Sequence, residues 1–149
     1  MPGASQLIVS ALVRRGESIL LVEQQGPSDP EPSWMLPGGR VEADETLLAA
    51  LEREPAEETG FALDGMPTIA FAVDLVTAAG TYSALTFDCQ VDGVLRPNDP
   101  DGFVRSAAGV RSSEAIDRMR LVEWYDCRPI ERYLSGEASS GTMYRMDRR

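Results

Sequence analysis

The segment from Trp34 to Phe61 constrains this chain more than any other, and it reads WMLPGGRVEADETLLAALEREPAEETGF. Two signals predict one long helix inside it. Asp44 can cap a helix that starts near Glu45, and Gly60 can close that helix in the left-handed conformation. The apolar residues between these ends are Leu47, Leu48, Ala50 and Leu51. They form a face that needs a sheet or another helix to cover it, so we expect this helix to pack on a core.

Three glutamates follow the apolar part of the predicted helix. Glu54, Glu57 and Glu58 are spaced i, i+3 and i+4, so their carboxylates share one helix face within a single turn. Like charges repel, and the C-terminal end of a helix disfavours anions. A divalent cation would remove both objections, because Mg²⁺ takes hard oxygen ligands. The alternative for three glutamates alone is a solvated acidic helix face.

The wider spacing of the segment decides between these alternatives. The fixed points are Gly39, Glu45, Arg53, Glu54, Glu57, Glu58, Gly60 and the apolar Phe61. This pattern resembles the MutT/Nudix box, in which glycine, glutamate, an Arg-Glu pair, a Glu-Glu pair and a final glycine recur at these intervals. The resemblance implies an α/β fold: a Nudix-type α/β/α sandwich with a mixed β-sheet, in which the box forms a loop-helix-loop. It implies a single domain over residues 1–149.

The resemblance also assigns roles within the box. Glu54, Glu57 and Glu58 would bind Mg²⁺ or Mn²⁺ together with the backbone carbonyl of Gly38, and the metal would activate a water that attacks a pyrophosphate. Glu54 and Glu57 would thereby be catalytic. Arg53 would pair with Glu45 to hold the loop-helix-loop rigid, an alternative being an ordinary exposed arginine. The structural positions of the motif would be Gly39, Glu45 and Gly60.

The general base is expected outside the box. Many Nudix members use a glutamate in the loop before the last strand, which favours Glu114, with Asp101 and Asp117 as rivals. A solvated loop acid is the alternative reading of Glu114.

Substrate contacts are expected from three further side chains. Arg105 and Arg111 could meet substrate phosphates, because guanidinium groups match phosphate oxygens. Trp34 could stack on a base, although a buried aromatic beside the box is the commoner role. No subfamily mark for ADP-ribose, diadenosine polyphosphates, NADH or coenzyme A is present, so the substrate stays open.

The composition excludes several kinds of catalytic site. The 149 residues include no histidine and no lysine, and all fourteen basic residues are arginine. A Ser-His-Asp triad, an HExxH zinc site, a Walker lysine and a Schiff-base lysine are therefore excluded. The net charge of −10 disfavours duplex nucleic acid as a partner but not a small phosphorylated nucleotide.

Cys89 and Cys127 have no CxxC spacing and are expected to be reduced thiols of a cytoplasmic protein, with no membrane partner. The oligomeric state stays open between a monomer and a homodimer.

The rest of the chain predicts the order of elements. A hairpin is expected from strands 6–13 and 18–23, a second pair of strands from 68–78 and 82–91, an irregular loop over 92–113, a last strand over Leu121–Tyr125, a short helix opened by Pro129, and a polar tail over 137–149. Tyr144 and Met146 are possible anchors within that tail.

One position departs from the Nudix pattern, which has an apolar helix former where this chain has Pro55. Proline removes a hydrogen bond to the Leu51 carbonyl, so we expect a kink or a widened turn between these residues. The leading hypothesis is a Mg²⁺-dependent hydrolase of a nucleoside diphosphate linked to another moiety. Its rivals are a nucleotide sensor without turnover, and isomerase chemistry on an allylic diphosphate.

Overall fold

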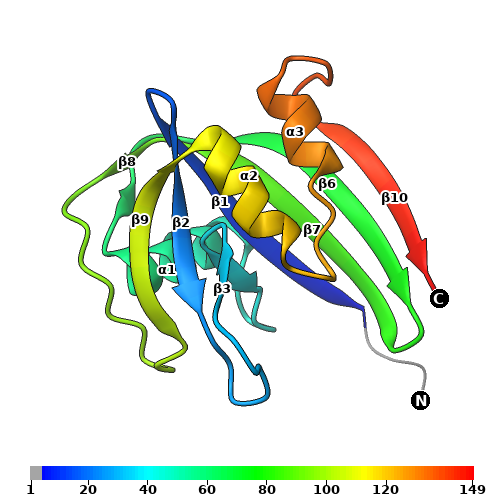
Figure 1. Ribbon diagram of the computed structural model, residues 1–149, viewed down its shortest axis with the longest axis horizontal. Coiled ribbons are helices and arrows are strands. Elements are labelled where there is room, and N and C mark those ends of the chain that lie inside the picture. Colours follow the sequence, from blue (N-terminus) through cyan, green and yellow to red (C-terminus); the bar gives the residue numbers. More distant parts are fainter. Residues whose placement is uncertain (1–4) are drawn as a thin grey trace.

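The computed structural model describes residues 5–149. These form an eight-stranded mixed sheet with helices on both faces (Figure 1) and a separate two-stranded antiparallel sheet, Ala62–Leu63 with Val91–Asp92. The spatial order of the strands is β10-β6-β7-β1-β2-β3, with β4 beside β1 and β9 beside β2. The strands are β1 (Gln6–Arg15), β2 (Ser18–Gln24), β3 (Ser33–Met35), β4 (Gly38–Arg40), β5 (Ala62–Leu63), β6 (Thr68–Thr77), β7 (Gly80–Cys89), β8 (Val91–Asp92), β9 (Val104–Arg111) and β10 (Thr142–Arg148). The helices are α1 (Leu47–Thr59), α2 (Ser112–Arg120) and α3 (Arg128–Leu134).

The alternation of side chains along β1 divides the core into two layers. Val9, Ala11 and Val13 are buried in the cluster that includes Leu51 of α1. Leu12 points the other way, into the cluster that holds the buried side chains of α2 and α3. Because successive residues of a strand face opposite sides, one apolar strand supplies both layers. The expected α/β/α sandwich is confirmed, and α1 lies on the opposite face of the sheet from α2 and α3.

The N-terminal end of α1 differs from the prediction, and the C-terminal end agrees with it. Thr46, not Asp44, caps the helix: its Oγ1 accepts a hydrogen bond from the Ala49 N–H at 3.1 Å. The helix therefore starts at Leu47, two residues later than expected. Gly60 ends it as predicted, with a left-handed φ of 84° and its N–H donated to the Ala56 carbonyl.

Pro55 is accommodated inside α1. The residues from Leu47 to Thr59 are α-helical without interruption, so the widened turn expected between Leu51 and Pro55 does not form. The proline ring is fully buried and takes the place of the apolar residue that the motif has at this position. Its carbonyl accepts a hydrogen bond from Thr59 Oγ1 at 2.6 Å. The lost N–H is therefore partly offset by apolar burial.

Two predictions for the C-terminal third are wrong. The segment Leu121–Tyr125 is a turn between α2 and α3, and the strand of this region is instead β9, inside the predicted irregular loop. β9 is poor in β-branched residues, and it forms because its backbone pairs with β2 from Arg111–Ser18 to Val104–Gln24.

The predicted polar tail is not a tail, because it contains β10, which pairs in parallel with β6. Tyr144 packs against the core beside Phe71, as the anchoring prediction required. The strand alternates Tyr144 and Met146 with charged residues, and a parallel partner far away in sequence stabilises it.

Both cysteines are buried free thiols, as expected, and burial raises the pKa of Cys89 to about 12 and that of Cys127 to about 11. None of the helices in residues 5–149 is long and apolar enough to span a bilayer.

Candidate active site

The site forms where the Gly38–Gly39 backbone of strand β4 meets α1. The Gly38 N–H donates to Glu58 Oε1 at 2.7 Å, while Gly38 itself pairs with Ser10 of β1. A Cβ on Gly39 would lie only 2.5 Å from Glu54 Oε1. A side chain here would push the Glu54 carboxylate away, so glycine lets that carboxylate lie against the backbone. The two ends of the motif are thus brought together as expected.

Burial perturbs two of the three glutamates. Glu58 is only 5% exposed, and burial raises its pKa to about 8, against the opposing effect of the Gly38 hydrogen bond. Burial also raises the pKa of Glu54, although the charge of Arg53 works in the other direction. Neighbouring carboxylates, including that of Asp99, add to both shifts. The site concentrates negative charge in a poorly solvated place, which favours a bound cation.

Arg53 holds this arrangement together. Its guanidinium binds Glu45 through two hydrogen bonds, Nε to Oε2 at 2.6 Å and Nη2 to Oε1 at 2.8 Å. Nη1 reaches Glu54 Oε1 at 3.0 Å and lies 3.5 Å from Glu57 Oε2. The bidentate pair holds the pKa of Glu45 down to about 2. The Arg53–Glu45 pairing is therefore as predicted, and Arg53 also orients Glu54 and Glu57.

The structure adds one acid that sequence reasoning missed. Asp99 lies in the loop that joins β8 to β9, and this loop is docked on the end of α1: the Arg96 N–H donates to the Thr59 carbonyl at 2.7 Å and the Asn98 N–H to the Glu57 carbonyl at 2.9 Å. The Asp99 carboxylate accepts backbone N–H groups of its own loop, including Phe103 at 2.9 Å. This acid lies within the predicted irregular loop over 92–113, and nothing in the local sequence indicates that the loop folds back onto the helix.

The predicted general base is not brought to this site. Glu114 lies on α2, on the opposite face of the sheet from α1, and pairs with Arg118 at 2.8 Å (Figure 1). Asp117 is on the same helix and pairs with Arg120. Asp101 is exposed in the Asp99 loop. Proximity to the glutamates therefore favours Asp99 over the three acids named from the sequence.

The predicted substrate contacts are dispersed. Arg105 lies at the start of β9 beside the Asp99 loop and donates to Gln25 Oε1 at 3.0 Å. Arg111 is at the far end of β9, opposite Ser18. Trp34 is partly buried against the core, and the Arg118 guanidinium covers its ring with its Cζ atom 4.7 Å from the ring centroid, so stacking on a base stays a prediction. Of these three residues, only Arg105 is next to the loop that reaches the glutamates.

The carboxylate oxygens of the site suit a hard divalent cation, although they do not form a complete set of ligands. Within residues 5–149, no three acidic, histidine or cysteine side chains converge into a ready ligand cage. Glu58 is engaged by the Gly38 N–H and Glu57 by Arg53. Mg²⁺ is commonly held by one or two carboxylates and keeps several waters, so a partial set of buried oxygens fits it better than a full cage would.

The fold and the box define a class of protein, and comparisons with known proteins agree. The family model described as NUDIX domain matches residues 4–126, and the chain belongs to this family. A NUDIX hydrolase from Nitrosomonas europaea superimposes with a TM-score of 0.77 at 24% identity, covering 92% of this chain and 93% of that one. A MutT NUDIX hydrolase from Burkholderia pseudomallei gives a TM-score of 0.62 at 28% identity, covering 77% and 86%.

Curated relatives match over part of the chain. A protein named putative 8-oxo-dGTP diphosphatase 2 of Mycobacterium tuberculosis is 43% identical over 56 residues, 38% of this chain and 40% of that protein. The CTP pyrophosphohydrolase of Escherichia coli is 42% identical over 53 residues, 36% and 39% of the two chains. This chain thus spans about two-fifths of the length of these relatives. Both names describe hydrolysis of a phosphoric anhydride, the bond type on which Nudix hydrolases act.

Proposed function

We propose that this protein is a Mg²⁺- or Mn²⁺-dependent pyrophosphohydrolase, which cleaves a nucleoside diphosphate linked to another moiety. The observation that carries the proposal is the approach of Glu54 and Glu58 to the Gly38–Gly39 backbone, with Glu58 buried and its pKa raised. The names of the relatives, a diphosphatase and a pyrophosphohydrolase of nucleotides, support the same bond type.

The cation would be held by Glu54, Glu57, Glu58 and the Gly38 carbonyl. When bound, it supplies Lewis acidity toward the pyrophosphate. Gly39 leaves room for the substrate and the carboxylates to share one small space. Arg53 keeps Glu54 and Glu57 aimed at that space, so it acts as a positioning residue.

The proton of the attacking water needs an acceptor, and we assign it to Asp99. Its carboxylate lies close enough to raise the pKa of both Glu54 and Glu58. Backbone N–H groups of its own loop, those of Asp101 and Val104, hold its carboxylate in place. Arg105, one residue beyond Val104, whose N–H binds Asp99, is placed to meet a substrate phosphate.

The test is a panel of nucleoside triphosphates, dinucleotides and nucleotide sugars assayed for product with Mg²⁺, with Mn²⁺ and with EDTA. We expect cation-dependent cleavage of a pyrophosphate, and the product pattern names the substrate class. Calorimetric titration of Mg²⁺ gives a readout that does not depend on finding the substrate. Absence of both cation binding and turnover would overturn the proposal.

Two variants of the same loop test the assignment of the general base. Asp99→Asn should lower kcat strongly and leave Mg²⁺ affinity nearly unchanged, while Asp101→Asn in the same loop should behave as wild type. Equal loss in both variants would remove Asp99 from this role.

A nucleotide sensor remains the second candidate, and the open ligand set within residues 5–149 favours it. A sensor would bind a nucleotide in calorimetry without converting it over many hours. Product formation excludes that alternative directly.

A further inference from the structure

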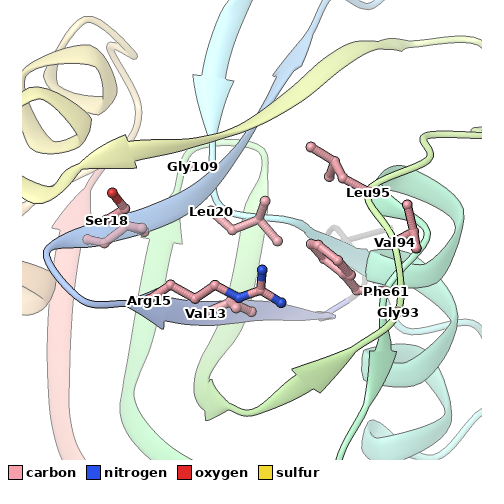
Figure 2. A pocket seen from close by; sticks show the side chains of 10 residues that line it. Val13, Arg15, Ser18, Leu20, Phe61, Gly93, Val94, Leu95 and Gly109 are labelled. Atoms are coloured by element: carbon pink, nitrogen blue, oxygen red, sulfur yellow. The ribbon is translucent and has the colours of Figure 1, made fainter.

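A second pocket lies on the α1 side of the sheet, away from the carboxylates. It has a volume of about 370 Å³, within the range of small-molecule sites. Its floor is formed by Val13 of β1 and Leu20 of β2, and one wall by Phe61, directly after the end of α1. Figure 2 shows the opposite rim, where Val94 and Leu95 project from the β8–β9 loop.

The pocket has a cationic side. Arg15 points from β1 over Phe61, with its Cζ atom 5.5 Å from the ring centroid (Figure 2). Arg111 lies close by through strand register: Ser18 pairs with Arg15 on one side and with Arg111 on the other, and directly opposed residues share a sheet face. Within residues 5–149, neither arginine forms an ion pair with a carboxylate. Both arginines therefore leave their charge available beside the apolar floor.

The apolar lining is accessible at the rim. Val94 is 71% exposed and Leu95 40% exposed, whereas Phe61 beneath them is buried. Gly109 of β9 adds no side chain, and a Cβ built there meets only the Ser18 Cβ, at 3.8 Å. The space above Gly109 is therefore open, and an apolar ligand body would cover surface that is now exposed.

We propose that this pocket is a second binding site, for a small organic anion with a flat apolar body. The body would lie over Leu20 and Phe61, and the anionic group would meet Arg15 and Arg111. The site is separate from the Glu54–Glu58 cluster. It stands independently of the proposed hydrolysis, because neither arginine is part of the carboxylate site.

The probe for this site is 1-anilinonaphthalene-8-sulfonate, an aromatic anion whose fluorescence rises on binding. We expect saturable binding of one probe per chain. Gly109→Val places a branched side chain in the open space and suits a strand, so it should weaken binding at least tenfold. Arg15→Gln and Arg111→Gln should each weaken binding severalfold and reduce its salt dependence.

Control variants and a second probe distinguish binding at this site from nonspecific hydrophobic binding. Arg145→Gln removes an exposed arginine from β10, far from the pocket, and should leave probe affinity unchanged. The uncharged N-phenyl-1-naphthylamine should bind more weakly than the sulfonate and be insensitive to Arg15→Gln. Thermal melts verify that each variant is folded.

Two results would overturn the proposal: no saturable binding of the sulfonate, or wild-type affinity in both folded Gly109→Val and the Arg15→Gln/Arg111→Gln double variant. Because binding is the readout, failure of this proposal leaves the hydrolase proposal untouched, and failure of the hydrolase assay leaves this one untouched.

Discussion

Helices α1 and α2 carry acids at the same spacing and use them differently. Glu54 and Glu57 on α1, like Glu114 and Asp117 on α2, are three residues apart and share a helix face. On α2 the two side chains are 58% and 73% exposed and pair with arginines of their own helix.

On α1 the neighbouring Glu58 is buried against the Gly38 backbone of β4, and the Glu54 side chain is 18% exposed. Spacing alone sets which acids lie together. The groups that pack on that face set their environment. A desolvated acidic cluster is therefore a better candidate for a functional site than a solvated one.

The largest expected effect tests this contrast on catalysis. Glu57→Gln and Glu58→Gln should each lower kcat by about 100-fold or more, equivalent to about 2.7 kcal/mol of transition-state stabilisation. Glu114→Gln should stay within twofold of wild type, since its carboxylate is on the other face of the sheet. Steady-state kinetics with the substrate found in the panel provides the measurement. Comparable losses in Glu114→Gln would erase the distinction between the helices.

The stabilising effect of Mg²⁺ should depend on the acids of α1 and not on those of α2. Mg²⁺ at 100 times its Kd should raise the free energy of unfolding of the wild type by about 2.7 kcal/mol, because it binds the folded state. Glu58→Gln should lose this gain. Without Mg²⁺ at neutral pH it should melt higher than wild type, because folding no longer has to bury a carboxyl whose pKa rises from 4.5 to about 8. Asp117→Asn on α2 should retain the full Mg²⁺ response. Thermal melts with Mg²⁺ and with EDTA decide it, and an unchanged Mg²⁺ response in Glu58→Gln would argue against the ligand assignment.

The arginines of the two helices should differ as well. Arg53→Lys loses the fork that binds Glu45 and Glu54, so it should lower the free energy of unfolding by about 1–2 kcal/mol. Arg120→Lys on α2, whose exposed side chain pairs with Asp117, should change it by about 0.5 kcal/mol or less, as expected for exposed pairs. Urea titrations of the two variants give these values. A similar cost for both would mean that the α1 network is no stronger than a surface ion pair.

The smallest expected effect is a pH dependence from Glu45. Its pKa is lowered from 4.5 to about 2 by Arg53, so its stabilising effect is complete above pH 4.5 and is lost as the pH falls through 2. Glu45→Gln should therefore flatten the acid side of the stability curve between these values. Melting temperatures of wild type and variant, measured from pH 2 to 6, should converge at the acid end. Parallel curves would contradict the assignment.

Much of the site was predictable from local sequence. The role of Gly60 depends on local helix geometry, which is nearly the same in any fold, and the Arg53–Glu45 pair followed from the resemblance of the segment to the MutT/Nudix box. The α/β/α sandwich followed from the box together with alternating apolar strands. Pro55 was the exception: its loss of a hydrogen bond was foreseeable, but the burial of its ring in an unbroken helix was not.

The remaining features depended on contacts between distant segments. β9 and β10 are strands because β2 and β6 offer them backbone partners, and strand propensity depends on such context more than helix propensity does. Glu114 and Asp99 both looked like loop acids in the sequence. Only the tertiary structure placed Glu114 on the far face of the sheet and docked Asp99 on the end of α1, because backbone hydrogen bonds to the Thr59 and Glu57 carbonyls hold that loop.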